Sequence, residues 1–261
     1  MTRPGVRWVA LAGVVTMAAM GAGCCTTGAA QAPMPIEEFR SLQAARVERT
    51  AAISATGTLE LRWRDDAGEH FESVDAQWWM ERPASMALLL KKLGERMALA
   101  GRDRDEAWVI DLRPKPPQLR VIARGEEPEG WAQALLPMHL PWLLGVAPLP
   151  EAEPQRSWDE AGVAWSSWGD RQIGWDHRGR PRSARILVGD RIVAESALDD
   201  GQWRSLAGID VLCGHCTLRS PEHGATADLY LYEPTSFEPG SKDKVLKLAE
   251  LRASLQPEVV P

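Results

Sequence analysis

Two cysteines near the end of the chain are the residues best suited to chemistry. Cys213-Gly214-His215-Cys216 places two thiols three positions apart, with an imidazole between them. Thiols at this spacing can exchange disulfides, form a structural disulfide, bind zinc together with His215 and His223, or remain free. A leader segment described below indicates export, and disulfides persist in oxidising compartments. We therefore predict a structural disulfide between Cys213 and Cys216.

The surroundings of this motif disfavour the other chemistries. The tetrad is identical to the active-site motif of protein disulfide isomerases, whose first cysteine opens a helix, whereas here Thr217-Leu218-Arg219-Ser220-Pro221 leads toward a predicted strand. A zinc site would usually have a second cysteine pair, which the sequence lacks. Nucleophile elbows, HExxH motifs and phosphate loops are also missing from the sequence. We expect no catalytic residue, no metal, no cofactor and no enzymatic activity.

The first 23 residues have the pattern of a secretory signal peptide. Arg3 and Arg7 precede an apolar stretch from Trp8 to Met20, and Gly21-Ala22-Gly23 follows it. The apolar stretch is shorter than the roughly 20 residues that span a bilayer, so we expect no transmembrane helix. Residues 1–23 are therefore predicted to be removed.

The residues around the predicted cleavage point resemble the bacterial lipobox, in which small residues precede a cysteine that becomes diacylated. Cys24 is the expected lipidation site, carrying acyl chains such as palmitate. Gly21 departs from the family, which usually has an aliphatic residue there, and Cys25 is the alternative anchor. In the Gram-negative sorting rule an Asp after the lipidated cysteine favours the inner membrane. Cys25 in that position therefore points to the outer membrane.

Composition restricts the partners of the exported chain. The full sequence has a net charge of −6, and removing Arg3 and Arg7 makes it two units more negative, so nucleic acid is not an expected partner. With 44% hydrophobic residues the chain can form an ample core. The sequence has 12 Trp against 2 Tyr and 3 Phe, a balance compatible with a filled core, an apolar cavity or a membrane-facing rim.

Hydrophobic periodicity predicts an α+β domain. Small and proline-rich residues 26–35 read as a tether, and Ile36 to Ala52 as an amphipathic helix. Alternating residues around the turn Asp65-Asp66-Ala67-Gly68 predict a hairpin, and further strands at 85–90, 96–100, 106–112 and 118–123 predict an antiparallel meander. Glu129 to Gly145 reads as an apolar helix interrupted near Pro137 and Pro141. Strands are expected again at 163–168, 172–176, 183–188, 191–198, 209–212 and 227–232, and a closing helix at 242–255.

The order of these elements resembles the LolA/LolB-type lipoprotein carriers and receptors, from about Ile53 to Glu233. Two segments carry the resemblance: Leu88-Leu89-Leu90-Lys91-Lys92-Leu93-Gly94, together with Ala55-Thr56-Gly57-Thr58-Leu59 and Trp78-Trp79 before it, and Leu140-Pro141-Trp142-Leu143-Leu144-Gly145. The resemblance implies a half-open antiparallel β-barrel with a helical lid, whose apolar interior holds acyl chains.

Candidate binding residues follow from alternation and from this resemblance. The expected lining of a lipid-binding cavity is Leu61, Trp63, Trp78, Met86, Leu88, Leu99 and Trp142. Burial of acyl groups contributes about 0.8 kcal/mol per CH₂, but the same residues could instead meet the helices and leave no space. Leu93, between two lysines and Gly94, is expected to be an exposed leucine that handles cargo or membrane, with burial under the sheet edge as the alternative.

These expectations combine into one organisation. Residues 1–23 are a lipoprotein signal peptide, 24–35 a lipidated tether and 36–261 a single lipid-binding domain. We expect a lipid-anchored monomer on the periplasmic face of the outer membrane that binds acyl chains or lipidated proteins, with a periplasmic carrier protein as a partner. The alternatives are a structural or assembly lipoprotein acting by protein contacts, and a thiol-disulfide protein using Cys213 and Cys216.

Overall fold

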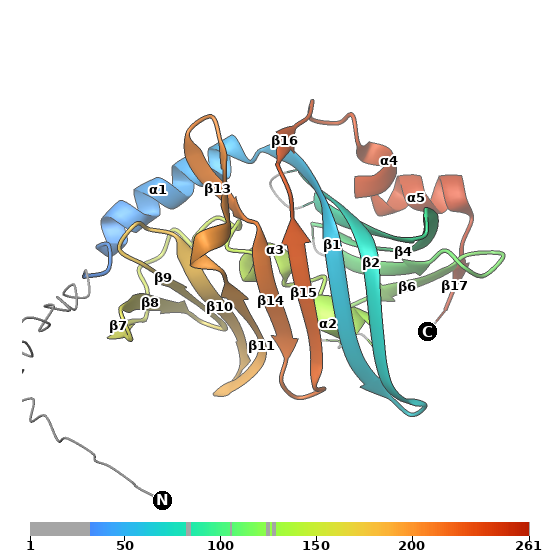
Figure 1. Cartoon of the computed structure of the whole chain (residues 1–261), viewed down its shortest axis with the longest axis horizontal. Coiled ribbons are helices and arrows are strands. Elements are labelled where there is room, and N and C mark those ends of the chain that lie inside the picture. Colours follow the sequence, from blue (N-terminus) through green and yellow to red (C-terminus); the bar gives the residue numbers. More distant parts are fainter. Residues whose placement is uncertain (1–31, 82–84, 105, 124–125, 127–128, 261) are drawn as a thin grey trace, which may run out of the picture. The chain divides into compact units, whose positions relative to one another are not determined.

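An antiparallel sheet dominates the computed structural model, which describes residues 32–81, 85–104, 106–123, 126 and 129–260 (Figure 1). Within these residues one 15-stranded sheet has the order β17-β6-β5-β4-β3-β2-β1-β15-β14-β11-β10-β9-β8-β7, with β16 also paired to β1. The terminal strands β17 and β7 are not neighbours in this order. The sheet of the described residues is therefore open, and the predicted half-open barrel is confirmed only as an open antiparallel sheet.

The first half of the chain forms consecutive hairpins. Its strands are β1 (Ala52–Asp65), β2 (Gly68–Glu81), β3 (Ser85–Lys92), β4 (Glu95–Asp103), β5 (Glu106–Asp111) and β6 (Gln118–Ile122). The second half contains β7 (Arg156–Glu160), β8 (Val163–Trp168), β9 (Arg171–Trp175), β10 (Pro181–Val188), β11 (Arg191–Leu198), β14 (His215–Ser220) and β15 (Ala225–Leu231). β15 pairs with β1 and joins the two halves.

Shorter elements complete the fold. A separate two-stranded sheet consists of β12 (Trp203–Leu206) and β13 (Ile209–Cys213), after the 3₁₀ turn η1 (Asp200–Gln202). The remaining short strands are β16 (Thr235–Ser236) and β17 (Glu258–Val259). The helices are α1 (Ile36–Arg49), α2 (Ala132–Leu135), α3 (Leu140–Leu143), α4 (Asp243–Leu246) and α5 (Leu248–Leu255).

Two apolar clusters lie on opposite faces of the sheet. On one face, called here the α2–α3 face, Leu135, Leu143 and Trp142 pack with inward residues of the strands such as Leu59 and Leu88. On the other, the α4–α5 face, Leu246, Leu248 and Leu251 pack with Trp79, Leu99, Trp108 and Leu119. Because successive residues of a strand point to opposite faces, β2 to β5 contribute apolar residues to both clusters.

Helix α1 packs against the sheet at β9. Phe39 stacks on Trp175 with ring centroids 4.2 Å apart, and the Arg46 side chain is 1% exposed. Its guanidinium donates to the carbonyl oxygens of Asp210 (2.7 Å) and Gly179 (3.1 Å). Burial lowers the pKa of Arg46 to about 10, even though the Asp210 carboxylate raises it. Helix α1 therefore buries one charged side chain, Arg46, and backbone carbonyl oxygens accept its hydrogen bonds.

Most predicted elements are present, with differences where local signals were weak. The predicted first helix ends at Arg49 rather than Ala52, and the closing helix is divided into α4 and α5. The interruption of the central apolar segment is confirmed, since Leu136 adopts a left-handed φ of 47° between α2 and α3. No strand is predicted at β7, β12, β14, β16 or β17; β14 begins at His215, inside the cysteine motif.

Candidate functional site

An apolar cavity opens on the α2–α3 face. Its volume is about 290 Å³, at the lower limit of the roughly 300–1,000 Å³ usual for ligand sites. Strands β1 to β4, the β5–β6 connection and the residue before α2 supply its lining. The lining residues are Leu61, Trp63, His70, Phe71, Glu72, Val74, Leu90, Met97, Ala98, Arg113 and Trp131.

The cavity has an apolar floor and a polar mouth. Leu61, Val74 and Leu90 are at most 5% exposed, whereas the Arg113 side chain is 60% exposed. Arg113 is held by Asp111, which accepts from its Nε at 3.0 Å and from its NH2 nitrogen at 2.7 Å. An apolar floor with charges only at the mouth suits a ligand with an apolar body and a polar end.

A stacked pair forms one wall of the mouth. The rings of Trp63 and His70 lie 4.9 Å apart and almost parallel, at 13°. His70 Nε2 lies 2.7 Å from a carboxylate oxygen of Asp65, and this hydrogen bond lowers the pKa of Asp65. Glu72 pairs with Lys92 at 2.5 Å, so the β1–β2 and β3–β4 hairpins are linked beside the cavity.

The structure places the sequence-predicted lining residues in three groups. Leu61 and Trp63 line the cavity, while Trp78, Met86 and Leu88 are at most 1% exposed in the cluster on the same face. Leu99 lies in the opposite cluster, so the expectation that it shares this lining is wrong. Its neighbours Met97, Ala98 and Ala100 are also apolar, and a strand buried on both faces carries no alternation to show which side is which.

Trp142 belongs to the covering segment rather than to the cavity lining. It is 3% exposed in α3, and its indole nitrogen donates to the Gln172 carbonyl oxygen at 3.0 Å. Arg102 donates to the carbonyl oxygen of Met138 at 2.9 Å. Gln43 of α1 donates to the carbonyl oxygens of Gly145 and Ala147, both at 2.9 Å. The α2–α3 segment is therefore held on the sheet by a few long-range hydrogen bonds and by its leucines.

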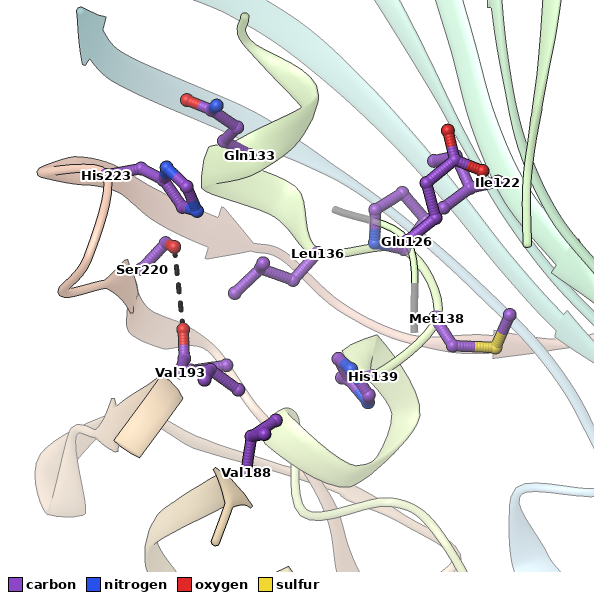
Figure 2. A pocket seen from close by; sticks show the side chains of 12 residues that line it. Ile122, Glu126, Gln133, Leu136, Met138, His139, Val188, Val193, Ser220 and His223 are labelled. Atoms are coloured by element: carbon purple, nitrogen blue, oxygen red, sulfur yellow. Dashed lines mark hydrogen bonds between the residues drawn. The ribbon is translucent and has the colours of Figure 1, made fainter. Parts of the chain in front are cut away.

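A smaller cavity of about 80 Å³ lies at the other side of the same segment (Figure 2). Leu136 and His139 of the α2–α3 connection face Ser220 and His223 of the β14–β15 hairpin across it, and Ser220 Oγ donates to the Val193 carbonyl oxygen at 3.5 Å. Glu126 and Gln133 also line it. These residues come from four separate segments, so no local sequence pattern could have grouped them.

Leu93 is the most exposed of the large apolar side chains in the described residues, at 97%. It lies with Gly94 in the two-residue turn between β3 and β4, where both residues have positive φ, 52° and 83°. Such a turn favours Asn or Gly at the first position, and leucine is strained there. The alternative that Leu93 tucks under the sheet edge is contradicted.

Cys213 and Cys216 are buried free thiols, so the structure does not contain the predicted disulfide. Cys213 Sγ instead donates to the His215 carbonyl oxygen at 2.9 Å and to that of Asp199 at 3.3 Å. Burial raises the pKa of Cys213 to about 11, and burial also raises that of Cys216. Cys216 lies in strand β14, not in a helix. Buried thiols that stay protonated are poor nucleophiles, which disfavours disulfide exchange.

Other chemistry has no support in the part of the chain that the structure describes. Those residues contain no group of three or more His, Cys, Asp or Glu side chains able to hold a metal ion. The helices found there are also too short or too polar to cross a membrane. The candidate lipidation sites Cys24 and Cys25 lie outside the described residues.

The open sheet is shared with proteins of known structure. The chain is similar to a LolA superfamily protein from Nitrosomonas europaea, with a TM-score of 0.53 and 10% identity over 78% of this chain and 96% of that one. The chain is also similar to a putative outer membrane lipoprotein-sorting protein domain from Vibrio parahaemolyticus. The TM-score is 0.53 and the identity 8%, over 83% of this chain and 99% of that one.

A protein of the DUF1329 family from Desulfovibrio piger gives a TM-score of 0.52 and 10% identity, again over 83% of this chain and 99% of that one. No family model and no curated protein matches the sequence. At these identities the likeness shows the fold, and the chain has a LolA-type fold.

Proposed function

We propose that this protein is a lipid-anchored carrier or receptor that binds acyl chains or lipidated proteins in the cavity lined by Leu61, Val74 and Leu90. The observation that carries the proposal is an apolar cavity of about 290 Å³ that is bordered by Trp131, the residue before the proline-broken helical segment, in a LolA-type fold. Lipidation of Cys24, or of Cys25, would hold the domain at the periplasmic face of the outer membrane, where a periplasmic carrier protein could deliver cargo.

Binding would rest on apolar area. Each CH₂ group transferred from water contributes about 0.8 kcal/mol, so a chain of a few carbons in the existing cavity is already held measurably. A longer chain would need the space now filled by Leu135 and Leu143, which are fully buried beneath α2 and α3. We propose that the α2–α3 segment is the lid, and that it moves off the sheet when a long chain enters.

We propose that cargo reaches the cavity past the strained turn at Leu93. Leu90 and Met97 of the same β3–β4 hairpin line the cavity, so the exposed leucine lies on the hairpin that forms one wall. An apolar side chain beside Lys91 and Lys92 suits contact with acyl groups below anionic headgroups. Leu93 would therefore contact the cargo or the membrane surface while the acyl chain moves.

Native mass spectrometry of the full chain, released from membranes in detergent, tests the proposal with added palmitate and a diacylated lipopeptide. Ala98→Leu fills the cavity from its wall and should reduce adduct occupancy about tenfold, which corresponds to about 1.4 kcal/mol. Leu99→Met changes the neighbouring residue on the opposite face and should leave occupancy unchanged. Equal occupancy in both variants would place the lipid elsewhere, and no adduct in any protein would overturn the carrier function.

A second candidate is favoured by the filling of the α2–α3 face. Leu140, Leu143 and Leu144 are at most 2% exposed, as expected if the face is a permanent core. The protein would then be a structural or assembly lipoprotein that acts through protein contacts. Absence of acyl adducts, together with hydrogen exchange in α2 and α3 as slow as in the central strands, would support this candidate.

A further inference from the structure

The terminal strand β7 has backbone hydrogen-bonding groups that no other strand of the described residues uses. β7 is the last strand of the sheet and pairs only with β8. The β7–β8 turn, Ala161 and Gly162, has positive φ at both residues (51° and 79°), as in a two-residue type I′ hairpin. In such a hairpin Glu160 and Val163, Trp158 and Trp165, and Arg156 and Ser167 exchange the hydrogen bonds.

This pattern leaves the main-chain groups of Ser157 and Asp159 directed to the open side of β7. The hydrogen bond from Gln155 N to the Ser167 carbonyl oxygen, 2.9 Å, fits a bulge next to the Arg156–Ser167 pair and supports the same alternation. An edge with two residues of free donors and acceptors is a template for another strand.

The side chains of β7 are complementary to β7 itself. We propose that two copies of this chain pair edge to edge through β7, antiparallel, about a two-fold axis at Trp158. In this register Arg156 lies opposite Glu160 of the second copy, and Ser157 lies opposite Asp159. The main-chain groups of Ser157 and Asp159 then form two hydrogen-bonded pairs, one on each side of the axis, as an antiparallel ladder requires.

The charges of this edge are unused in the single chain. The guanidinium carbon of Arg156 lies 5.2 Å from the centroid of the Trp158 ring. Neither Arg156 nor Glu160 forms an ion pair with any described residue. Pairing would place Arg156 of each copy opposite Glu160 of the other copy. Opposite charges that face each other across strands stabilise a sheet.

Arg185, Trp165 and Trp158 stack in a row that ends at the proposed two-fold axis. Arg185 lies over the Trp165 ring at 4.3 Å, and Trp165 stacks on Trp158 with centroids 5.8 Å apart and planes 7° apart. Gly174 leaves the room for this, because a Cβ atom there would lie 2.7 Å from the Trp165 ring. Trp158 is only half buried and would stack on its equivalent in the second copy, where large aromatic side chains contribute strongly to association.

The two-fold axis is perpendicular to the sheet, so both copies keep the same face on the same side. Met34 and Ile36 lie next to this edge, since they line a cavity of about 220 Å³ together with Ser157 and Asp159. Both domains therefore begin on one side of the pair. If the proposed lipid anchor is present, one membrane can hold both copies, and their shared surface raises the effective concentration. A five-residue edge is small, so the pair should be transient in free solution.

Disulfide trapping of the full chain in membranes tests the register. In Trp158→Cys the two cysteines face each other with Cα atoms about 4.5 Å apart, within the range of a disulfide. Mild oxidation should give a band of twice the chain mass that reductant removes. Glu160→Cys is the matched control, because its two copies would lie roughly 13 Å apart along the strands and should not join. The wild-type chain shows what its own cysteines contribute.

One further design keeps the test decisive if Trp158→Cys fails to fold, and a charge swap tests the same pairing when Trp158→Cys folds. Co-expressed Arg156→Cys and Glu160→Cys chains keep Trp158 and should join to each other but not to themselves. In the Trp158→Cys chain, Arg156→Glu should lower the trapped yield about tenfold, and adding Glu160→Arg should restore it. No dimer from either design, a yield indifferent to the charge swap, or trapping to a protein of another mass would overturn the proposal. None of these readouts requires a bound lipid.

Discussion

The two faces of the sheet bury similar side chains in different ways. On the α4–α5 face Leu246, Leu248 and Leu251 are at most 3% exposed against Trp108 and its neighbours. On the α2–α3 face the two covering helices have four residues each and are separated around the left-handed Leu136 (Figure 1). The connection between them borders the cavity of about 80 Å³, and Trp131, just before α2, borders the cavity of about 290 Å³. Equal burial is thus reached by two kinds of cover: a continuous helical pair on one face, and on the other a broken segment held by its leucines and a few hydrogen bonds. We expect the broken cover to be the less rigid one.

The largest expected effect separates the two faces by their response to a lost side chain. Leu119→Ala, on the α4–α5 face, should lower the free energy of unfolding by about 4 kcal/mol, because the site cannot collapse. Leu143→Ala, under α3, should cost about 2 kcal/mol, because a short segment can settle into the space. Both leucines are fully buried, so the two variants remove the same side chain from equally buried positions. Equal losses in urea titrations would remove the proposed difference.

Titration of the buried thiols tests whether water is excluded from the β13–β14 end of the α2–α3 face. Cys213 keeps its proton to a pKa of about 11 in the folded chain, against 9.0 for an ordinary thiol. Its contribution to stability is complete below pH 9 and is lost as pH rises from 9 to 11, by at most about 1.4 kcal/mol per pH unit. Urea titrations at several pH values should show this slope, reduced in Cys213→Ala.

Thiol labelling provides the control for that experiment. Iodoacetamide should label Cys213 and Cys216 slowly in the folded chain at pH 8, and completely in urea without reductant. Protection that persists in urea would mean that the two residues form the disulfide expected from the sequence, and the pH slope would then be absent.

The hydrogen bonds over α3 allow the comparison to be sharpened. Trp142→Phe removes the indole donor to Gln172 but keeps an aromatic ring, and should cost about 1 kcal/mol. Hydrogen exchange in residues 132–144 should become faster, while exchange in α5 stays unchanged. Faster exchange in both segments would show that the two covers unfold together, contrary to the comparison.

The smallest effect is expected at the β3–β4 turn. Leu93→Asn should raise the free energy of unfolding by roughly 0.5 kcal/mol, because Asn tolerates the left-handed conformation better than Leu. The same variant should slow lipid transfer between vesicles if the exposed leucine serves the proposed function. Unchanged transfer in Leu93→Asn would leave the strained leucine without a role in lipid handling.

The sequence by itself determined the elements whose signals are local. Alternation around Asp65–Gly68 specified the β1–β2 hairpin, and Pro137 and Pro141 specified the break in the central apolar segment. The connection predicted at 91–94 is present as the two-residue turn Leu93-Gly94, but the residues alone left open whether the Leu93 side chain is exposed or buried under the sheet edge.

Only the tertiary structure decided which residues meet. Leu99 could not be assigned to a face, because β4 is covered on both sides and a doubly buried strand carries no polar alternation. His223 and Leu136 border one cavity although they are distant in sequence, since the contact depends on how the α2–α3 segment lies over β14. Strand β7 became an unpaired edge for the same reason: strand order is fixed by long-range pairing, which local residue patterns do not encode.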